Sequence, residues 1–342
     1  MGKVEHVRME ALACAVPTQS ITLLDRASDF GESTVRKISL GTGISSYRKA
    51  TDEQCASDFC FAAASKLLDQ NPKLRSEIDS LIFVTQTPDY RLPATACILQ
   101  ERLQLSTHCA AFDINLGCSG YVYGLWMASG LIAAGLSRKV LLLVGDTITK
   151  TVAQNDRSVS LLFGDAGSAT ILGQSPDPGD AFIFDVGTDG AGFDNIIVKS
   201  GGFRKPSEET RVEADSYLKM NGPGVFEFTQ TRIADSLVKL MATSGTSRDN
   251  LDFFVPHQAN AMLLERLSAK LNIKRESLVV GLAEFGNTSS VTIPLALVTH
   301  CGEALRDRAR KRFLLSGFGV GLSWASTICD LGGVLVPPLV EV

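Results

Sequence analysis

Short apolar runs alternate with segments of helical periodicity along most of the chain. In the first half, the runs have strand length and the segments between them place apolar residues at helical spacing. This pattern predicts strands at 81–85, 110–114, 140–144 and 168–172, and helices at 94–103 and 120–134. Buried strands that alternate with helices are typical of a layered α/β fold.

The same alternation resumes after a short break in composition. Gly173 to Asp180 reads GQSPDPGD, which is typical of a surface turn or linker. In each half, strands end at polar or Gly-rich turns and apolar helices follow, so we expect two similar halves, residues 1–174 and 175–342, around one core. Segment 187–206 is expected to be a long loop. Beyond the break, the pattern predicts strands at 181–186, 251–255, 312–316 and 322–330, and helices at 222–243, 259–271 and 290–310.

Composition and charge make some classes of partner improbable for this chain. The 342 residues are 45% hydrophobic, which is enough for two domain-sized units or one large α/β domain. With 33 Lys and Arg against 37 Asp and Glu, the chain is a poor candidate for binding nucleic acid or anionic lipid. No apolar run reaches the roughly 20 residues of a membrane span, and the polar start lacks a signal-peptide core. We therefore expect a cytoplasmic protein without nucleic-acid or membrane partners.

The eight cysteines and four histidines do not have the spacing of a metal site. No C-x-x-C pair occurs, and the closest pair, Cys55 and Cys60, has no His nearby. We therefore expect no metal. In a reducing cytosol, most of these cysteines are expected to be small buried hydrophobic residues.

Cys118 is the strongest candidate for chemistry. It lies in DINLGCSGY, where a predicted strand ends in a tight Gly turn and a helix begins. The free N–H groups and the dipole at a helix N-terminus stabilise a thiolate, so we expect a lowered pKa. The position alone fits a cysteine that merely packs in the core equally well.

Three further segments place polar or Gly residues at turns. His257 lies in VPHQAN, where a strand runs into a helix, and it is either catalytic or structural. Asn287 lies in FGNTSS, which also fits an ordinary helix entry capped by Ser or Thr. The segment GFGVGLSW, residues 317–324, is either a flexible hairpin or a rigid wall whose N–H groups face a developing oxyanion.

Together, the GCSG, VPHQAN, FGNTSS and GFGVGLSW segments, in this order, resemble the thiolase-fold condensing enzymes. The closest branch is the β-ketoacyl-acyl-carrier-protein synthase III type. The segments TGI at 42–44 and FGDAGSA at 163–169 extend the resemblance over essentially the whole chain. It implies an α/β, thiolase-like five-layered αβαβα fold of two similar halves, usually assembled as a homodimer.

The resemblance also implies an acyltransferase reaction and residue roles. Cys118 is implied to take an acyl group from a thioester, and a decarboxylative Claisen condensation with malonyl-acyl carrier protein or malonyl-CoA follows, in fatty-acid, specialised-metabolite or polysaccharide-linked biosynthesis. His257 and Asn287 match the pair that hydrogen-bonds the malonyl thioester carbonyl. The backbone N–H groups of Cys118 and Val320 match the oxyanion hole. Loss of CO₂ supplies the carbanion, so no cofactor is expected besides the coenzyme A or carrier phosphopantetheine of the substrates.

Several positions differ from the family's usual residues, and others match its substrate-binding residues. The last Gly-rich turn has no Cys, unlike that of the thiolases, which disfavours reversible thiolysis. The Trp and Arg that grip coenzyme A near TGI in the family are absent from residues 36–45, whereas Arg157 matches the adenine-side Arg. Phe318 and Gly319 are assigned to substrate binding. Leu92 matches the residue that the partner subunit inserts into the acyl pocket.

Docking of a carrier protein is the least defined feature. The family has a basic residue two positions after HQAN, but here Ala261 and Met262 follow. The basic side chains on and after that helix are candidates for contact with an acidic carrier, and a solvated helix face explains them as well. These candidates are Arg266, Lys270, Lys274 and Arg275.

Two other functions stay open from the sequence. An acyltransferase of the same fold would move the acyl group to an amine or hydroxyl without condensation. Some such relatives replace the Asn, so Asn287 favours condensation. A non-catalytic scaffold subunit would usually lose the nucleophile, so Cys118 argues against it.

Overall fold

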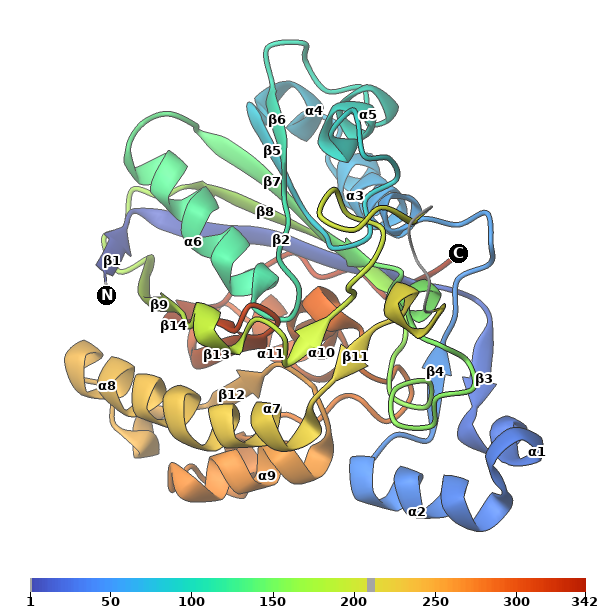
Figure 1. The fold of residues 1–342 in the computed structure, drawn as a ribbon. Coiled ribbons are helices and arrows are strands. Elements are labelled where there is room, and N and C mark those ends of the chain that lie inside the picture. The colour runs from blue at the N-terminus through green and yellow to red at the C-terminus, as the bar shows by residue number, and fades with distance from the viewer. Residues whose placement is uncertain (1, 208–212) are drawn as a thin grey trace.

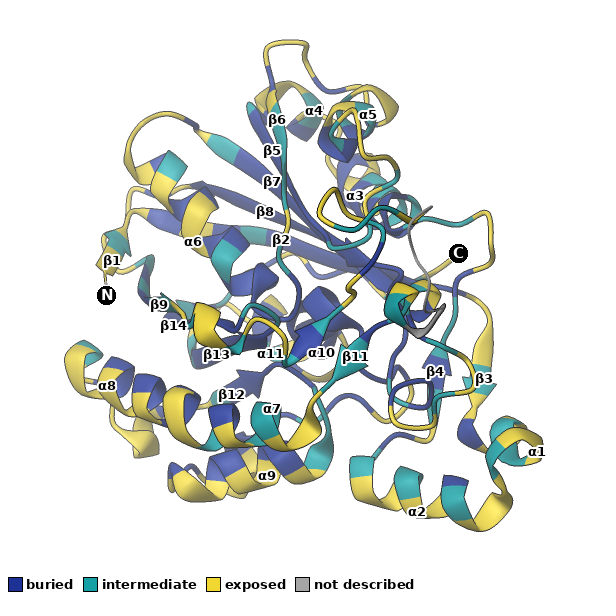
Figure 2. Cartoon of the chain, viewed as in Figure 1, coloured by how far each residue is buried: buried dark blue, intermediate teal, exposed yellow. Residues whose placement is uncertain are grey.

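A computed structural model describes residues 2–207 and 213–342 of the chain. Two β-sheets lie face to face with helices between them, and further helices cover both outer sides (Figure 1). Buried residues concentrate on the strands and on the helices between the sheets, and exposed residues concentrate on the outer helices (Figure 2). The arrangement therefore has five layers, helix–sheet–helix–sheet–helix.

The six-stranded sheet belongs mainly to the first half, and its strand order is β15-β2-β8-β7-β5-β6. Strands β5, β6 and β7 are parallel, β8 is antiparallel to both of its neighbours, and β15 is parallel to β2. Helices α3 (Ala56–Gln70), α4 (Leu74–Glu77) and α5 (Thr95–Arg102) lie on its outer side. The strands are β2 (Val7–Val16), β5 (Ser80–Val84), β6 (Ala110–Ile114), β7 (Lys139–Asp146), β8 (Ala166–Gln174) and β15 (Val340–Glu341).

The five-stranded sheet belongs mainly to the second half, and its strand order is β1-β9-β14-β13-β12. Only β12 and β13 are parallel, and the other neighbours are antiparallel. Helices α8 (Ala234–Ser244) and α9 (Ala261–Lys270) bury apolar faces against its outer side. The strands are β1 (Gly2–Glu5), β9 (Ala181–Thr188), β12 (Phe253–Pro256), β13 (Lys311–Gly319) and β14 (Ser323–Leu331).

The two sheets repeat one topology. In each half, the first strand of the repeat pairs with the last, and the order continues with the fourth and the second strand. The third strand is β6 in the first half, whereas in the second half a single bridge between Phe254 and Leu278 stands in its place. Each terminal strand joins the sheet of the other half: the N-terminal β1 pairs with β9, and the C-terminal β15 pairs with β2. The predicted division at residue 174 lies at the end of β8, but the halves share one core.

Helices α6 (Gly120–Ala133) and α10 (Thr292–His300) lie between the sheets. Both helices are apolar on nearly all sides, which is expected for helices buried against two surfaces. Each follows a loop at the same place in its repeat. The loop before α6 contains Cys118, and the loop before α10 contains Asn287.

Two long helices expected from the sequence are divided. The segment 290–310 forms a short 3₁₀ turn, η9 (Ser289–Val291), then α10, then α11 (Gly302–Arg306). The segment 222–243 consists of α7 (Gly222–Phe228), a π-helical turn, η6 (Thr229–Ile233), and α8. Periodicity alone could not reveal these interruptions, because the apolar positions continue through them.

Smaller elements complete the described part of the chain. The expected loop 187–206 contains β10 (Ile196–Ile197), which pairs with β11 (Lys219–Met220). No helix among the described residues combines the length and the apolar character needed to cross a membrane. Strands β3 (Ser20–Thr22) and β4 (Ser46–Arg48) and helices α1 (Ala27–Phe30) and α2 (Glu32–Thr42) form a lobe beside the second sheet (Figure 1).

Candidate active site

Segments from both halves meet at a small apolar cavity of about 50 Å³. The six predicted residues that line it come from four separate segments of the sequence. They are Cys118, His257, Asn287, Phe318, Gly319 and Val320. The fold therefore brings together the residues that the four motifs singled out.

Cys118 lies in the turn between β6 and α6, two residues before the first residue of the helix. The β13–β14 turn packs directly against it. Gly319 has φ +156°, and a Cβ there would lie 2.8 Å from the Cys118 Cβ and 3.0 Å from its Sγ. Because such contacts are closer than van der Waals distance, only glycine fits at this position. The turn predicted as either hairpin or rigid wall is a hairpin packed against Cys118.

Hydroxyl groups fasten this hairpin to the start of α6. The Ser323 hydroxyl donates to the Val320 carbonyl at 2.7 Å, and its oxygen lies 2.7 Å from the Ser119 Oγ. Ser119 directly follows Cys118. Both serines are buried, so the hydrogen bonds are shielded from water. The position of the Val320 backbone is thereby fixed relative to Cys118.

The electrostatics of the Cys118 thiol differ from the sequence-based expectation. Burial, together with the nearby Asp146 carboxylate, raises the pKa of Cys118 to about 12. Hydrogen bonds from the backbone N–H of Val320, the Ser289 side chain and the N–H of Cys118 itself oppose this rise. The expected lowering of the pKa by the α6 N-terminus is therefore wrong for the resting site, where desolvation outweighs it.

The same hydrogen bonds bear on the predicted oxyanion hole. The backbone N–H groups of Cys118 and Val320 lie near enough to the Cys118 sulfur to lower its pKa. A carbonyl carbon bound to that sulfur would hold its oxygen close to the same two donors. The geometry is compatible with an oxyanion hole, which needs two preorganised N–H groups beside the reacting carbon.

His257 follows the last residue of β12 and is almost fully buried. Its backbone N–H donates to the Ser316 carbonyl at 2.7 Å, and its Nδ1 lies 2.7 Å from the Thr292 Oγ1. The edge of one ring faces the other between His257 and Phe318, with centroids 5.7 Å apart. Burial lowers the pKa of His257 to about 3, so the imidazole is neutral near pH 7.

The rest of the VPHQAN motif supports His257 structurally. The Gln258 amide donates to the Pro256 and Val279 carbonyls and accepts from the Gly281 N–H at 2.8 Å. The Asn260 side chain caps α9 by accepting from the Leu263 N–H at 2.8 Å. The motif is thus one histidine that faces the cavity and two amides that fix the strand-to-helix corner.

Asn287 is held by both its backbone and its side chain. Its N–H donates to the Leu162 carbonyl at 2.7 Å, and its carbonyl accepts from the Gly164 N–H at 3.1 Å. Its side-chain oxygen accepts from the Ser289 N–H at 2.9 Å. Since the oxygen is occupied, the amide nitrogen is left to donate into the cavity.

Four polar residues around these side chains were not identified from the sequence. Asp146, the last residue of β7, accepts from the Gln86 N–H at 2.8 Å and from the Ser290 hydroxyl at 2.6 Å. The Ser289 side chain lies beside both Cys118 and Asp146 and lowers the pKa of each. Ser289 and Thr292 resembled helix-capping residues in the sequence, and Gln86 and Asp146 merely followed or ended predicted strands. No local pattern separates such residues from ordinary turn residues.

The remaining predicted substrate-binding residues lie away from the Cys118 cavity. The Leu92 side chain is 85% exposed. Arg157 is exposed and lines a separate hollow of about 500 Å³ together with Phe30, Tyr217 and Lys219. The roles of Leu92 and Arg157 in substrate binding stay predictions.

The four candidate docking residues are all exposed, but each is engaged within the chain. Arg266 lies over the Phe226 ring, 5.4 Å from its centroid, and Lys270 donates to the Gln230 carbonyl. The other two are in ion pairs, Lys274 with Asp249 at 3.4 Å and Arg275 with Glu265 at 3.2 Å. Exposed pairs of this kind are weak and can be exchanged for contacts with a partner. Docking by these residues also stays a prediction.

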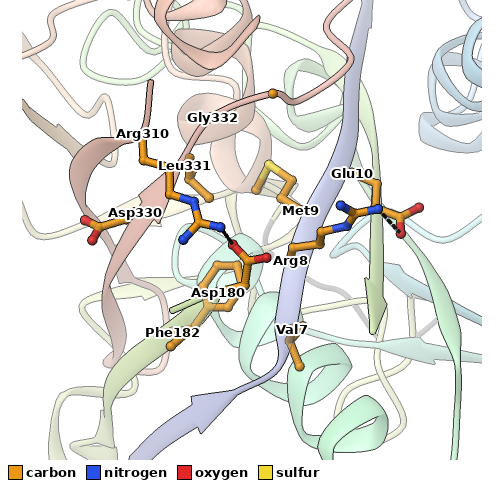
Figure 3. A pocket seen from close by; sticks show the side chains of 12 residues that line it. Val7, Arg8, Met9, Glu10, Asp180, Phe182, Arg310, Asp330, Leu331 and Gly332 are labelled. Carbon is orange, nitrogen blue, oxygen red and sulfur yellow. Dashed lines mark ion pairs between the residues drawn. The ribbon is translucent and has the colours of Figure 1, made fainter. Parts of the chain in front are cut away.

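Another hollow, of about 180 Å³, contains no predicted site residue and has a structural explanation (Figure 3). Its charged side chains pair with one another, Arg310 with Asp180 at 2.8 Å and Arg8 with Glu10 at 3.5 Å. Among residues 2–207 and 213–342, no cluster of three or more His, Cys, Asp or Glu side chains is arranged to hold a metal ion.

Comparison with known proteins assigns the chain to a family. The family model for 3-oxoacyl-[acyl-carrier-protein] synthase III matches residues 112–190, and the model for its C-terminal part matches residues 241–331. The β-ketoacyl-[acyl-carrier-protein] synthase III of Roseiflexus sp. is 34% identical over 324 residues, which cover 94% of this chain and 98% of that protein.

Solved structures agree with this result. The 3-oxoacyl-(acyl-carrier protein) synthase of Burkholderia xenovorans LB400 is 38% identical, covers 100% of this chain and 98% of its own, and superimposes with a TM-score of 0.95. The priming β-ketosynthase of the R1128 polyketide biosynthetic pathway is 25% identical, with a TM-score of 0.85 and coverage of 98% and 99%. The thiolase-like fold predicted from the motifs is thereby confirmed, and the chain belongs to the β-ketoacyl-acyl-carrier-protein synthase III family of condensing enzymes.

Proposed function

We propose that this chain is an acyltransferase of the 3-oxoacyl-acyl-carrier-protein synthase III type. It loads an acyl group from a thioester onto Cys118 and then condenses that group with a malonyl thioester. The observation that carries the proposal is that Cys118, His257 and Asn287 line one apolar cavity. A nucleophile and two neutral hydrogen-bond donors in a dry site are what this two-step reaction requires.

In the first step, the Cys118 sulfur attacks the thioester carbonyl, and the coenzyme A or carrier thiol leaves with the proton. The backbone N–H groups of Cys118 and Val320 stabilise the oxyanion of the tetrahedral intermediate. The acyl chain then occupies the apolar part of the cavity. That part is lined by Ile148, Phe163, Ile196 and Leu218.

In the second step, a malonyl thioester takes the place of the departed thiol. The Asn287 amide and the His257 imidazole donate hydrogen bonds to its carbonyl oxygen, which gains negative charge as CO₂ is lost. The resulting carbanion attacks the acyl group on Cys118, forms the new carbon–carbon bond and releases the Cys118 sulfur. Low polarity favours this step, because a carboxylate is converted to neutral CO₂ while fixed donors stabilise the enolate. No metal or organic cofactor takes part.

The thioesters are proposed to be carried by coenzyme A or by an acyl carrier protein. Arg157 lines the same hollow as Phe30, Tyr217 and Lys219, and these side chains offer contacts for a nucleotide or a carrier phosphopantetheine phosphate. Arg266, Lys270, Lys274 and Arg275 offer positive charge to an acidic carrier. The reaction is proposed to take place in the cytoplasm.

A homodimer is proposed as the assembled state. Strand β6 is the edge of the six-stranded sheet, and such an edge presents unpaired backbone groups that native proteins usually cover. The exposed Leu92 follows the neighbouring strand β5 and is available to reach into a second copy. Sedimentation of the protein at micromolar concentration tests this assembly, and a monomer would contradict it.

An intact-mass experiment tests the proposed function. The protein is incubated with acyl-CoAs and acyl carrier proteins of varied chain length, and a malonyl thioester is then added. We expect a covalent adduct of acyl mass on Cys118, followed by its loss with release of CO₂. Absence of an adduct with every donor would contradict acyl transfer. An adduct that persists with malonyl thioester but transfers to an amine or hydroxyl would support the acyltransferase without condensation.

A further inference from the structure

The Nδ1 atom of His257 lies beside the Thr292 hydroxyl, which also contacts the Ser289 carbonyl. The Thr292 Oγ1 lies 2.7 Å from Nδ1, and the Ser289 carbonyl also hydrogen bonds to the ring. The same hydroxyl lies 3.2 Å from the Ser289 carbonyl. His257, Ser289 and Thr292 are all buried, so water does not compete for these contacts.

The protonation of His257 limits what these groups can do. A neutral imidazole carries one N–H, on either Nδ1 or Nε2. In the condensing step proposed above, the nitrogen that faces the substrate must donate, which requires the proton on Nε2. Nδ1 must then accept a hydrogen bond. A carbonyl cannot donate, so among the described contacts of Nδ1 only the Thr292 hydroxyl can supply that proton.

We propose that Thr292 is a positioning residue whose hydroxyl, by donating to Nδ1, holds His257 as the Nε2–H tautomer. This inference rests on the proposed function and assigns a new residue to it. The shorter of the two hydroxyl contacts, 2.7 Å against 3.2 Å, is the one to His257. Thr292 is the first residue of α10 and does not line the cavity, so it acts only through the histidine.

Removing the Thr292 hydroxyl should change the tautomer of His257. Without Thr292 Oγ1, Nδ1 loses its described hydroxyl partner, and the Ser289 carbonyl beside the ring accepts but cannot donate. The proton then moves to Nδ1, and Nε2 presents a lone pair to the malonyl carbonyl oxygen. Decarboxylation loses a donor and gains a repulsion, whereas acyl transfer to Cys118 uses the backbone N–H groups and is little affected.

Thr292→Val tests the proposal, because valine has the same shape without the hydroxyl. Thr292→Ser is the matched control, because serine keeps the hydroxyl. We expect Thr292→Val to slow CO₂ release from malonyl thioester on the order of 10²-fold, as for loss of one fixed donor. Acylation of Cys118 by acyl thioester, followed by intact mass, should stay within about threefold, and Thr292→Ser should retain both rates.

Nitrogen-15 NMR of protein labelled at histidine gives a readout that a merely structural role would not change. The wild type should show the His257 proton on Nε2, and Thr292→Val should show it on Nδ1, with His257→Gln used to assign the signals. An unchanged tautomer in Thr292→Val, or equal losses of acylation and decarboxylation, would overturn the proposal. The tautomer is measured without substrate, so this result is independent of whether the proposed reaction itself is correct.

Discussion

The loops before α6 and α10 occupy the same place in the two repeated halves, yet they carry different chemistry. The loop before α6 places Cys118 against a glycine hairpin, and its contacts are mostly backbone groups. The loop before α10 places Asn287 and Ser289 in a network of side-chain hydrogen bonds. The repeat supplies two loops at the same cavity, and in the proposed reaction one half contributes the nucleophile and the other the hydrogen-bond donors.

A second pair of equivalent positions shows the same division. Gln86 follows β5 in the first half, and His257 follows β12 in the second. Both line the cavity, so the carboxyl end of β5 in the six-stranded sheet and that of β12 in the five-stranded sheet open onto the same site. Asp146 joins the two halves at this point through Gln86 and Ser290. The cavity is thus formed by residues of both halves, and neither half alone contains all the residues that line it.

The largest expected loss of activity comes from removing the Cys118 thiol, which the first half contributes to the site. Cys118→Ala should lower condensation by at least about 10³-fold and abolish the acyl adduct, because the covalent intermediate cannot form. Rates of product formation and intact mass measure both effects. Cys329→Ala, which removes a buried cysteine on β14, is the control and should keep the adduct. An adduct that survives Cys118→Ala would contradict the assignment of the nucleophile.

A smaller loss of acylation is expected from a change in the second half at Gly319, where the β13–β14 hairpin packs against Cys118. In Gly319→Ala, the added Cβ would lie 2.8 Å from the Cys118 Cβ, so either the nucleophile or the hairpin must move. We expect acylation to fall about 10–100-fold, in line with the cost of misplacing a reacting group by roughly 1 Å.

Gly333→Ala separates crowding from backbone strain. Gly333 also has a positive φ, +67°, but has open space around its Cβ position. It should leave acylation unchanged. Equal losses in the two variants would show that close packing on Cys118 is not the cause.

One further expected effect needs no substitution, and it is the pH dependence of the resting thiol. Because burial raises the pKa of Cys118 to about 12, the thiolate fraction should rise about tenfold per pH unit through the neutral range. Alkylation of Cys118 by iodoacetamide, followed by peptide mass spectrometry between pH 6 and 9, should therefore increase without a plateau. The exposed Cys97 reports access of the reagent. A plateau near pH 7 would instead favour stabilisation of the thiolate by α6.

The sequence predicted more of the fold than of the site's internal bonding. Alternating apolar runs placed most strands, and the four motifs indicated the residues that meet at the cavity, because each motif places polar or Gly residues at a turn. The interruptions before α8 and α10 could not be predicted, since the apolar pattern continues through them. Thr292 and Asp146 were missed because their roles depend on partners more than 30 residues away along the chain.

In the proposed reaction, the first half captures the acyl group and the second half drives decarboxylation. Asn287→Ala, studied by single-turnover intact mass, tests this division of roles most directly. We expect the variant to form the Cys118 acyl adduct at nearly the wild-type rate, while its turnover with malonyl thioester falls about 10²–10³-fold, so that the acyl-enzyme accumulates. An Asn287→Ala protein that fails to form the adduct, or that consumes it at the wild-type rate, would contradict this division.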